Sequence, residues 1–116
     1  MPNTISFCMI AKNEEKLIGN CLSSVQEIAD EIIVVDTGST DRTVKIAQSF
    51  GARILYHKWD GNYGRAQNVF VQAATQDWIL TLDGDEAIAQ QDVPKIKRLV
   101  HRREFIGYRL MVRNYT

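Results

Sequence analysis

Two aspartates flanking a glycine, Asp83-Gly84-Asp85, follow an apolar run and are the residues whose spacing points most directly to chemistry. On an extended segment, carboxylates two residues apart can present oxygen ligands in one direction, and the glycine lets a ligand approach the backbone. Such hard ligands select Mg²⁺ or Mn²⁺ over zinc, and these ions commonly bridge protein carboxylates and ligand phosphates. We therefore expect a metal site for a diphosphate here. An acidic turn after a strand is the simpler alternative.

Two other polar clusters also follow apolar runs. Asn13, Glu14 and Glu15 form the first cluster, and the second is the segment Asp36-Thr37-Gly38-Ser39-Thr40-Asp41. Each has a structural alternative. The glutamates could simply favour the first turn of a helix, and the second segment could be only a turn and a helix cap.

Alternating strands and helices must position these clusters. Apolar, β-branched runs predict strands at residues 4–10, 31–35, 52–56, 77–82 and 105–112. Three- and four-residue apolar spacing predicts helices from 14 to about 30, from 40 or 41 to 51, from 65 to 75, and after 92. Residues 57–64 are rich in turn formers and aromatic side chains and are predicted to form a loop.

This order predicts the α/β class, as a Rossmann-like three-layer sandwich with a mostly parallel sheet. Ligands of such sheets bind beyond the carboxyl ends of the strands, and the three polar clusters follow the first, second and fourth predicted strands. Acidic groups converging on one edge would repel each other unless a cation offsets their charge. A divalent metal, Mn²⁺ or Mg²⁺, meets this requirement.

Length and composition limit what else the chain can be. Its 116 residues suit one domain, residues 1–116, and its 14 basic and 14 acidic side chains cancel, so nothing indicates nucleic acid as a partner. Cys8 and Cys21 lack a C-x-x-C spacing and are expected to be buried thiols. No apolar run reaches the roughly 18 residues of a membrane span. We therefore expect a cytoplasmic protein with no membrane segment in this chain.

Four motifs in order resemble the family 2 glycosyltransferases. The segment Ser6–Glu15 is similar to the family's first strand and Asn-Glu loop, and Cys21–Val25 to the end of its first helix. Val34–Asp41 resembles its second-strand signature, and Asp77–Glu86 its D-x-D strand. The resemblance covers nearly the whole chain. It implies the glycosyltransferase-A fold and metal-dependent sugar transfer from a nucleotide-diphospho-sugar, with inversion at the anomeric carbon and UDP-sugars favoured.

The resemblance also implies roles for individual residues. Asp36 would recognise the base, and Ala11, Asn13 and Glu14 would hold the base and ribose. Asp83 would contact the ribose and share the metal with Asp85. Ala66-Gln67-Asn68 stands where many relatives carry Ala-Arg-Asn, and the nearest arginine is Arg65. Gln67 and Asn68 complete the predicted donor-nucleotide site. Glutamine supplies no positive charge, so a contact to base or diphosphate is expected to be weakened or re-routed.

The family's acceptor-side half is expected beyond Thr116, together with the carboxylate that deprotonates an unknown acceptor. We therefore predict an N-terminal portion of a longer enzyme, ending after about the fifth strand, with no catalytic base identified and inactive alone. The edge of such a sheet predicts self-association.

Three rival interpretations remain open. A sugar nucleotidyltransferase would more often show a glycine-rich, basic loop after the first strand, and Ala11-Lys12-Asn13-Glu14 is not such a loop. A receiver-type module would place Asp36 in an Mg²⁺ pocket that accepts phosphate. A degenerate α/β module retained for protein contacts would keep the fold without the activity.

Overall fold

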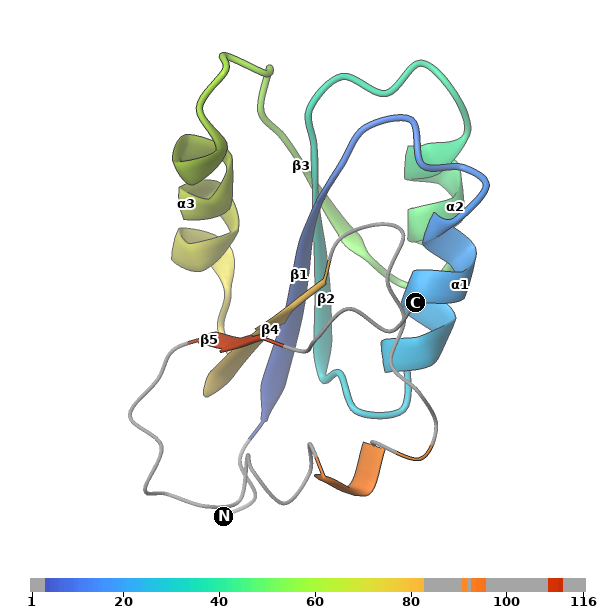
Figure 1. Ribbon diagram of the computed structural model, residues 1–116, viewed down its shortest axis with the longest axis vertical. Coiled ribbons are helices and arrows are strands. Elements are labelled where there is room, and N and C mark those ends of the chain that lie inside the picture. Colours follow the sequence, from blue (N-terminus) through green and yellow to red (C-terminus); the bar gives the residue numbers. More distant parts are fainter. Residues whose placement is uncertain (1–3, 83–90, 92, 96–108, 112–116) are drawn as a thin grey trace.

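The computed structural model describes residues 4–82, 91, 93–95 and 109–111. Strands and helices alternate from residue 5 to residue 81, as the sequence predicts (Figure 1), and the helix predicted after residue 92 lies largely outside the described residues. The elements are β1 (Ile5–Ala11), α1 (Ile18–Val25), β2 (Glu31–Asp36), α2 (Thr43–Ser49), β3 (Arg53–Tyr56), α3 (Tyr63–Ala73), β4 (Trp78–Thr81) and β5 (Arg109–Met111). Within these residues, no helix is long and apolar enough to cross a membrane.

All of the strand pairings are parallel, in a five-stranded sheet of order β3-β2-β1-β4-β5. β1 lies between β2 and β4, with Ala11 paired to Asp36 and Cys8 to Thr81. The strand order reverses between β1 and β4, so β1 lies at this switch point and its carboxyl end is flanked by those of β2 and β4. In such sheets, ligands bind at this kind of position.

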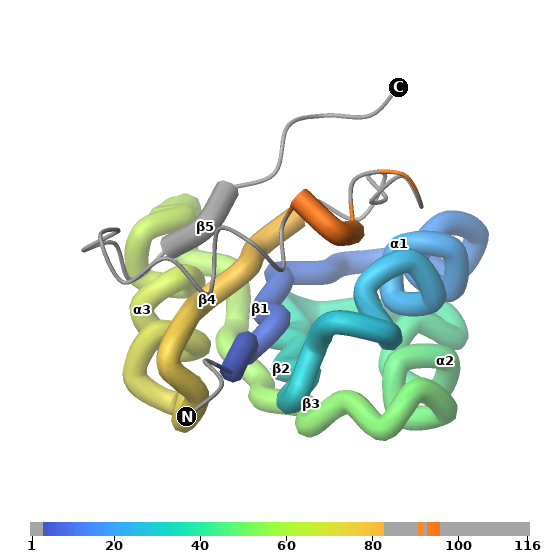
Figure 2. Tube along the Cα trace, turned by 90° about the horizontal axis from the view of Figure 1, so that it is seen from below, coloured from blue at the N-terminus to red at the C-terminus, as the bar shows by residue number. Residues whose placement is uncertain are grey.

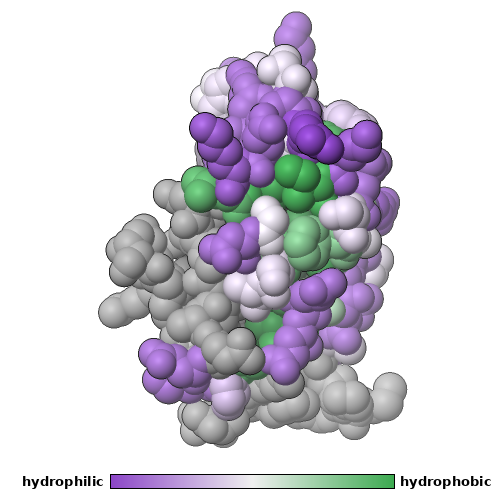
Figure 3. All heavy atoms as spheres, turned by 90° about the vertical axis from the view of Figure 1, so that its right-hand side faces the viewer, coloured by the Kyte–Doolittle hydropathy of each residue, from purple (hydrophilic) through white to green (hydrophobic). Residues whose placement is uncertain are grey.

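Helices cover both faces of the sheet, so the predicted α/β sandwich is confirmed (Figure 2). One core cluster joins α1 and α2 to the sheet through Phe7, Met9 and Val34. A smaller cluster joins α3 to Cys8, Ile33 and Val35 on the other face. The residues alternate between the two clusters along β1, β2, β3 and β4, because successive strand side chains point to opposite faces. The outer surface of the α1 and α2 layer is mainly hydrophilic around a smaller hydrophobic area (Figure 3).

The predicted buried thiols are confirmed. Cys8 and Cys21 are both free and buried. Burial raises the pKa of the Cys8 thiol to about 12, and the charge of Glu31 adds to this. Cys8 therefore stays protonated and unreactive at neutral pH.

Three helix starts differ from the prediction, and that of α2 is at Thr43 instead of residue 40 or 41. α1 begins at Ile18, and the preceding residues form a turn in which Leu17 N and Ile18 N donate to Glu14 O at 3.0 and 2.8 Å. α3 begins at Tyr63, two residues before the predicted start, because Asn62 Oδ1 accepts from Arg65 N at 3.0 Å and caps the helix. The predicted end of α2 at Gly51 is confirmed. Gly51 has a positive φ of 81° and donates to Gln48 O at 3.0 Å.

Side chains tie the strands together at the amino ends of the sheet. Glu31 Oε1 accepts from Ser6 Oγ at 2.7 Å and from Thr75 N at 3.0 Å. Asp77 Oδ2 accepts from Thr4 N at 3.0 Å, and Asp30 Oδ2 accepts from Ile5 N at 2.8 Å. These contacts lie opposite the carboxyl edge and leave that edge to the loops after β1, β2 and β3.

Candidate functional site

The predicted site residues of β1 and β2 meet at the carboxyl edge of the sheet. Ala11 and Asp36 are the last residues of their strands and are paired neighbours. Both are buried, at 2% and 4% exposure. Thr37 N donates to Ala11 O at 3.1 Å and continues the ladder by one residue past the strands. The structure therefore brings these two predicted residues together at one point.

Asp36 has one oxygen in a turn and one without a partner. Its Oδ2 accepts from Gly38 N at 3.2 Å and from Ser39 N at 3.1 Å. Gly38 has a φ of 125°, a backbone conformation that favours glycine. Asp36 Oδ1 is buried and accepts no hydrogen bond from the described residues. The turn expected as the simpler interpretation is present, but it uses only one of the two carboxylate oxygens.

Asn13 joins the loop after β1 to the loop after β2. Its Oδ1 accepts from Thr40 N at 2.8 Å, and its own N–H donates to Ser39 Oγ at 2.9 Å. These bonds require a left-handed backbone at Asn13, with a φ of 53°, which asparagine tolerates better than most residues. The side-chain oxygen and the backbone N–H of Asn13 are thus both occupied within the protein, which leaves its side-chain amide nitrogen for a ligand.

Glu14 and Asp41 reinforce the same junction. Glu14 N donates to Thr43 Oγ1 at 2.8 Å, and Asp41 Oδ1 accepts from Thr43 N at 2.9 Å. Burial on its own would raise the pKa of Asp41, but hydrogen bonds from Thr43 and Glu15 outweigh it and hold that pKa below its ordinary value. The two loops behind Asp36 are therefore fixed to each other by hydrogen bonds.

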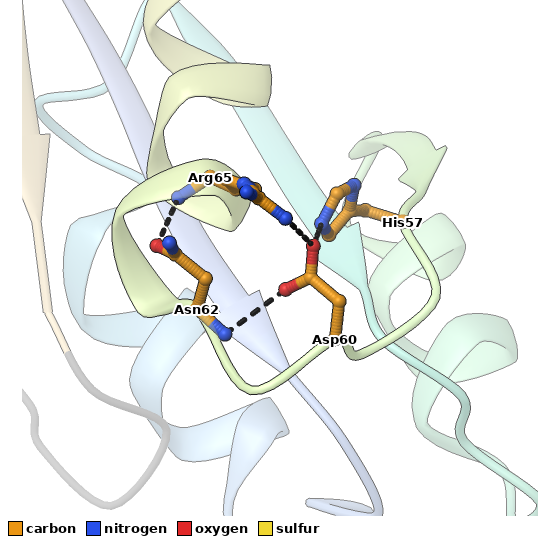
Figure 4. Close-up of polar contacts among 4 residues, drawn as sticks. All are labelled: His57, Asp60, Asn62 and Arg65. Carbon is orange, nitrogen blue, oxygen red and sulfur yellow. Dashed lines mark hydrogen bonds and ion pairs between the residues drawn. The ribbon is translucent and has the colours of Figure 1, made fainter.

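The loop between β3 and α3 begins beside Asp36, because His57 N donates to Asp36 O at 3.0 Å. Figure 4 shows its polar contacts: Asp60 Oδ1 accepts from Asn62 N at 2.9 Å, and Arg65 Nη1 donates to Asp60 Oδ2 at 3.2 Å. The hydrogen bond from Asn62 N is the main reason that the pKa of Asp60 lies below its ordinary value, and Arg65 lowers it further. Sequence analysis assigned no role to Asp60 or Arg65.

The predicted site residues on α3 are less buried than Asp36. Gln67 is half-buried and Asn68 is exposed. Trp59 and Tyr63, at 43% and 46% exposure, lie outside the core. The signal that could have placed the start of α3, and with it the polar contacts of the loop, was Asn62, a favoured capping residue three residues before Arg65.

The predicted metal ligands Asp83 and Asp85 lie outside the described residues. β4 ends at Thr81, and the described chain continues only to Leu82 at the carboxyl edge next to β1. Within the described part of the chain, no three histidine, cysteine or acidic side chains gather as metal ligands. The metal site therefore stays a prediction that depends on the D-x-D segment.

Comparison with protein families identifies the family of this chain. The model described as Glycosyl transferase family 2 matches residues 6–115, nearly the whole chain. The chain belongs to this family. The match includes the loops after β1 and β2, and it confirms the resemblance seen in the sequence motifs.

Several curated proteins are similar to this member of the family. It is 38% identical over 107 residues to a TPR repeat-containing protein of Synechococcus elongatus, covering 92% of this chain and 27% of that protein. It is 38% identical over 110 residues to an uncharacterized glycosyltransferase of Rickettsia bellii, covering 91% and 37%. It is 35% identical over 114 residues to the glycosyltransferase SunS of Bacillus subtilis, covering 97% and 27%. The chain thus spans well under half the length of these relatives.

Solved structures support the glycosyltransferase-A type of fold. TarS 1–349 of S. aureus superposes with a TM-score of 0.75 at 23% identity, covering 87% of this chain and 33% of that one. Glucosyl-3-phosphoglycerate synthase of Mycobacterium tuberculosis in complex with UDP gives 0.70 at 26% identity, covering 87% and 41%. A structure of that synthase with Mn²⁺, UDP and glucosyl-3-phosphoglycerate gives 0.63 at 28% identity, covering 73% and 36%.

Proposed function

We propose that this chain forms the nucleotide-binding part of the donor site in a glycosyltransferase that uses a nucleotide-diphospho-sugar. The observation that carries the proposal is Asp36, a buried carboxylate with one unpartnered oxygen at the carboxyl edge of the sheet. Leaving a buried acceptor unpaired costs about 1–3 kcal/mol, and a ligand N–H bonded to that oxygen would recover much of this cost. The imide N–H of uracil is a suitable donor.

Uracil is favoured over other bases for two reasons. An acceptor-only carboxylate selects a base with a ring N–H, which uracil presents at N3 and guanine at N1, whereas adenine and cytosine present none at the corresponding positions. The synthase of Mycobacterium tuberculosis, which is similar in fold, has been solved with UDP. Ala11, Asn13 and Glu14 line the adjoining loop, where they would meet the base and ribose, with Asn68 exposed on α3.

We further propose that Asp83 and Asp85 hold Mn²⁺ or Mg²⁺ against the donor diphosphate. These residues carry the hard oxygen ligands that such ions prefer, and they follow β4, which leads to the carboxyl edge beside β1. When bound, the ion neutralises negative charge on the leaving nucleoside diphosphate. Transfer with inversion needs a base that takes the proton of the acceptor hydroxyl, and no residue of this chain is assigned that role. The acceptor is not identified.

Calorimetric titration of UDP, GDP and several UDP-sugars, with and without Mn²⁺, tests the proposal. We expect UDP to bind and Mn²⁺ to strengthen its binding. Asp36→Asn should weaken UDP binding about tenfold in both conditions, because a charge-assisted hydrogen bond is replaced by a neutral one. Asp85→Ala should remove only the dependence on Mn²⁺.

Glu27→Gln is the matched control for Asp36→Asn. Glu27 is an exposed residue that follows α1, and its substitution removes the same single negative charge. Its affinity for UDP should equal that of the wild type. Thermal unfolding of each variant checks that the turn at Asp36 still folds. Failure of the wild-type chain to bind any of these nucleotides would refute the donor-site proposal and favour a degenerate module.

A further inference from the structure

The loop between β3 and α3 carries a positive side chain for which the proposed donor site has no role. Its first residue, His57, is hydrogen-bonded through its backbone to Asp36 O, so the loop starts at the proposed base-binding residue. His57 Nε2 is buried without a hydrogen-bond partner among the described residues, as is Asp36 Oδ1. Asp36 ends β2 and His57 directly follows the neighbouring strand β3, so both residues lie at the carboxyl edge of the sheet.

Arg65 is held in a defined place at this edge. Its backbone N–H is fixed by Asn62 Oδ1 in the first turn of α3, and its Nη1 contacts Asp60 Oδ2 at 3.2 Å (Figure 4). Asp60 is oriented in turn by Asn62 N and lies 3.8 Å from His57 Nε2. Within the described residues the guanidinium makes this one ion pair, and its side chain is 68% exposed. Most of its donors therefore remain accessible to a ligand.

Stability alone gives little reason for this arrangement. Exposed ion pairs contribute little to folding because water screens them and both side chains lose freedom. A guanidinium offers donors in a planar fork that matches two phosphate oxygens, whereas glutamine offers no charge. Gln67, two residues further along α3, therefore cannot perform the task that Arg65 can.

We propose that Arg65 binds phosphate oxygens of the donor nucleotide and that Asp60 is the positioning residue that orients its guanidinium toward the carboxyl edge. The inference rests on the proposed donor site and adds to it a protein side chain that contacts the diphosphate directly, beside the proposed metal ion. The base would contact Asp36, and the phosphates would lie toward the start of α3. Because the contact is an ion pair, no proton moves and no covalent bond forms or breaks.

The test compares UDP with uridine on wild-type protein, Arg65→Gln, Asp60→Asn and Lys58→Gln. Uridine carries the base and ribose without phosphate, so it reports the Asp36 side of the site alone. Arg65→Gln should weaken UDP binding about ten- to a hundredfold, the loss expected for a charge-assisted contact, and leave uridine binding unchanged. Its UDP affinity should also depend less steeply on salt.

Lys58→Gln removes the same charge from an exposed position in the same loop and should change UDP affinity less than about twofold, because screened surface charges act weakly. Asp60→Asn should weaken UDP binding by about two- to fivefold, the scale of an exposed ion pair. An increase in UDP affinity in Asp60→Asn would overturn the positioning role, because it would mean that Asp60 competes with the phosphates for Arg65.

The outcomes separate this inference from the proposed function. If the wild type binds UDP and Arg65→Gln binds it equally tightly, the inference is overturned and the donor-site proposal stands. The ion pair would then serve only to close the loop. Equal losses for UDP and uridine would also overturn it, since the effect would not be specific to phosphate. A wild-type chain that binds neither ligand would refute the donor site and this inference together. Arg65→Lys keeps the charge and should recover part of the UDP affinity, which a folding defect would not allow.

Discussion

Asn13 shows how a single residue holds the two loops of the site together. Its backbone adopts a left-handed conformation with a φ of 53°, and its side-chain oxygen accepts from Thr40 N at 2.8 Å. Glycine adopts this backbone without strain, whereas most other residues pay about 1–2 kcal/mol. Two substitutions can therefore separate the contributions that the backbone and the side chain of Asn13 make to the free energy of unfolding.

We expect Asn13→Gly to lower the free energy of unfolding by about 1 kcal/mol, the loss of one hydrogen bond. Asn13→Ala should cost about 1 kcal/mol more than Asn13→Gly, because alanine also bears the backbone strain. Urea unfolding of the three proteins measures both differences. Equal stability of the two variants would show that the backbone at this position relaxes.

At the level of elements, the amino ends of β1, β2 and β4 are tied by Glu31. Burial on its own would raise the pKa of Glu31, but hydrogen bonds from Thr75 and Ser6, together with the charge of Arg53, hold it below its ordinary value of 4.5. A carboxylate with a lowered folded-state pKa stabilises the protein above the unfolded-state pKa. That stabilisation is lost as the pH falls through the folded-state value.

Glu31→Gln should therefore destabilise the protein by about 1 kcal/mol at pH 7, where the wild-type side chain is ionised and hydrogen-bonded. The difference should shrink as the pH falls below 4.5, because the wild-type protein then loses the same charge. Urea unfolding at a series of pH values gives both free energies. Glu27→Gln, at an exposed position, serves as the control. A difference that persists undiminished at the lowest pH would assign the effect to packing and not to charge.

At the level of the whole molecule, β3 and β5 are the outermost strands of the described sheet. Strands at such edges present unpaired backbone groups that can pair with another chain. We therefore expect self-association through β5.

Size-exclusion chromatography with light scattering should give a mass that rises with protein concentration. Tyr56→Lys places a charge on the opposite edge, at a position that is 69% exposed on β3, and should leave that rise unchanged if β5 forms the contact. A strict monomer at high concentration would argue against self-association. A rise abolished by Tyr56→Lys would move the contact to β3.

The sequence by itself determined the order of elements, the parallel α/β class and the family. These follow from local signals: apolar, β-branched runs such as residues 31–35, the glycine that ends α2, and motifs that lie at strand ends. The same signals placed Ala11 and Asp36 at one edge, because carboxyl ends of parallel strands meet there.

Only the tertiary structure decided how each site side chain is used. Asn13 is tied to Thr40, Asp36 keeps one oxygen unpartnered, and Arg65 contacts Asp60. The arrangements of Asn13 and Asp36 depend on how loops from different strands approach each other. The contact of Arg65 depends on a turn that places a loop residue beside a helix. Hydrogen bonds of this kind depend on through-space distances of about 3 Å, and neither residue type nor sequence spacing encodes such distances.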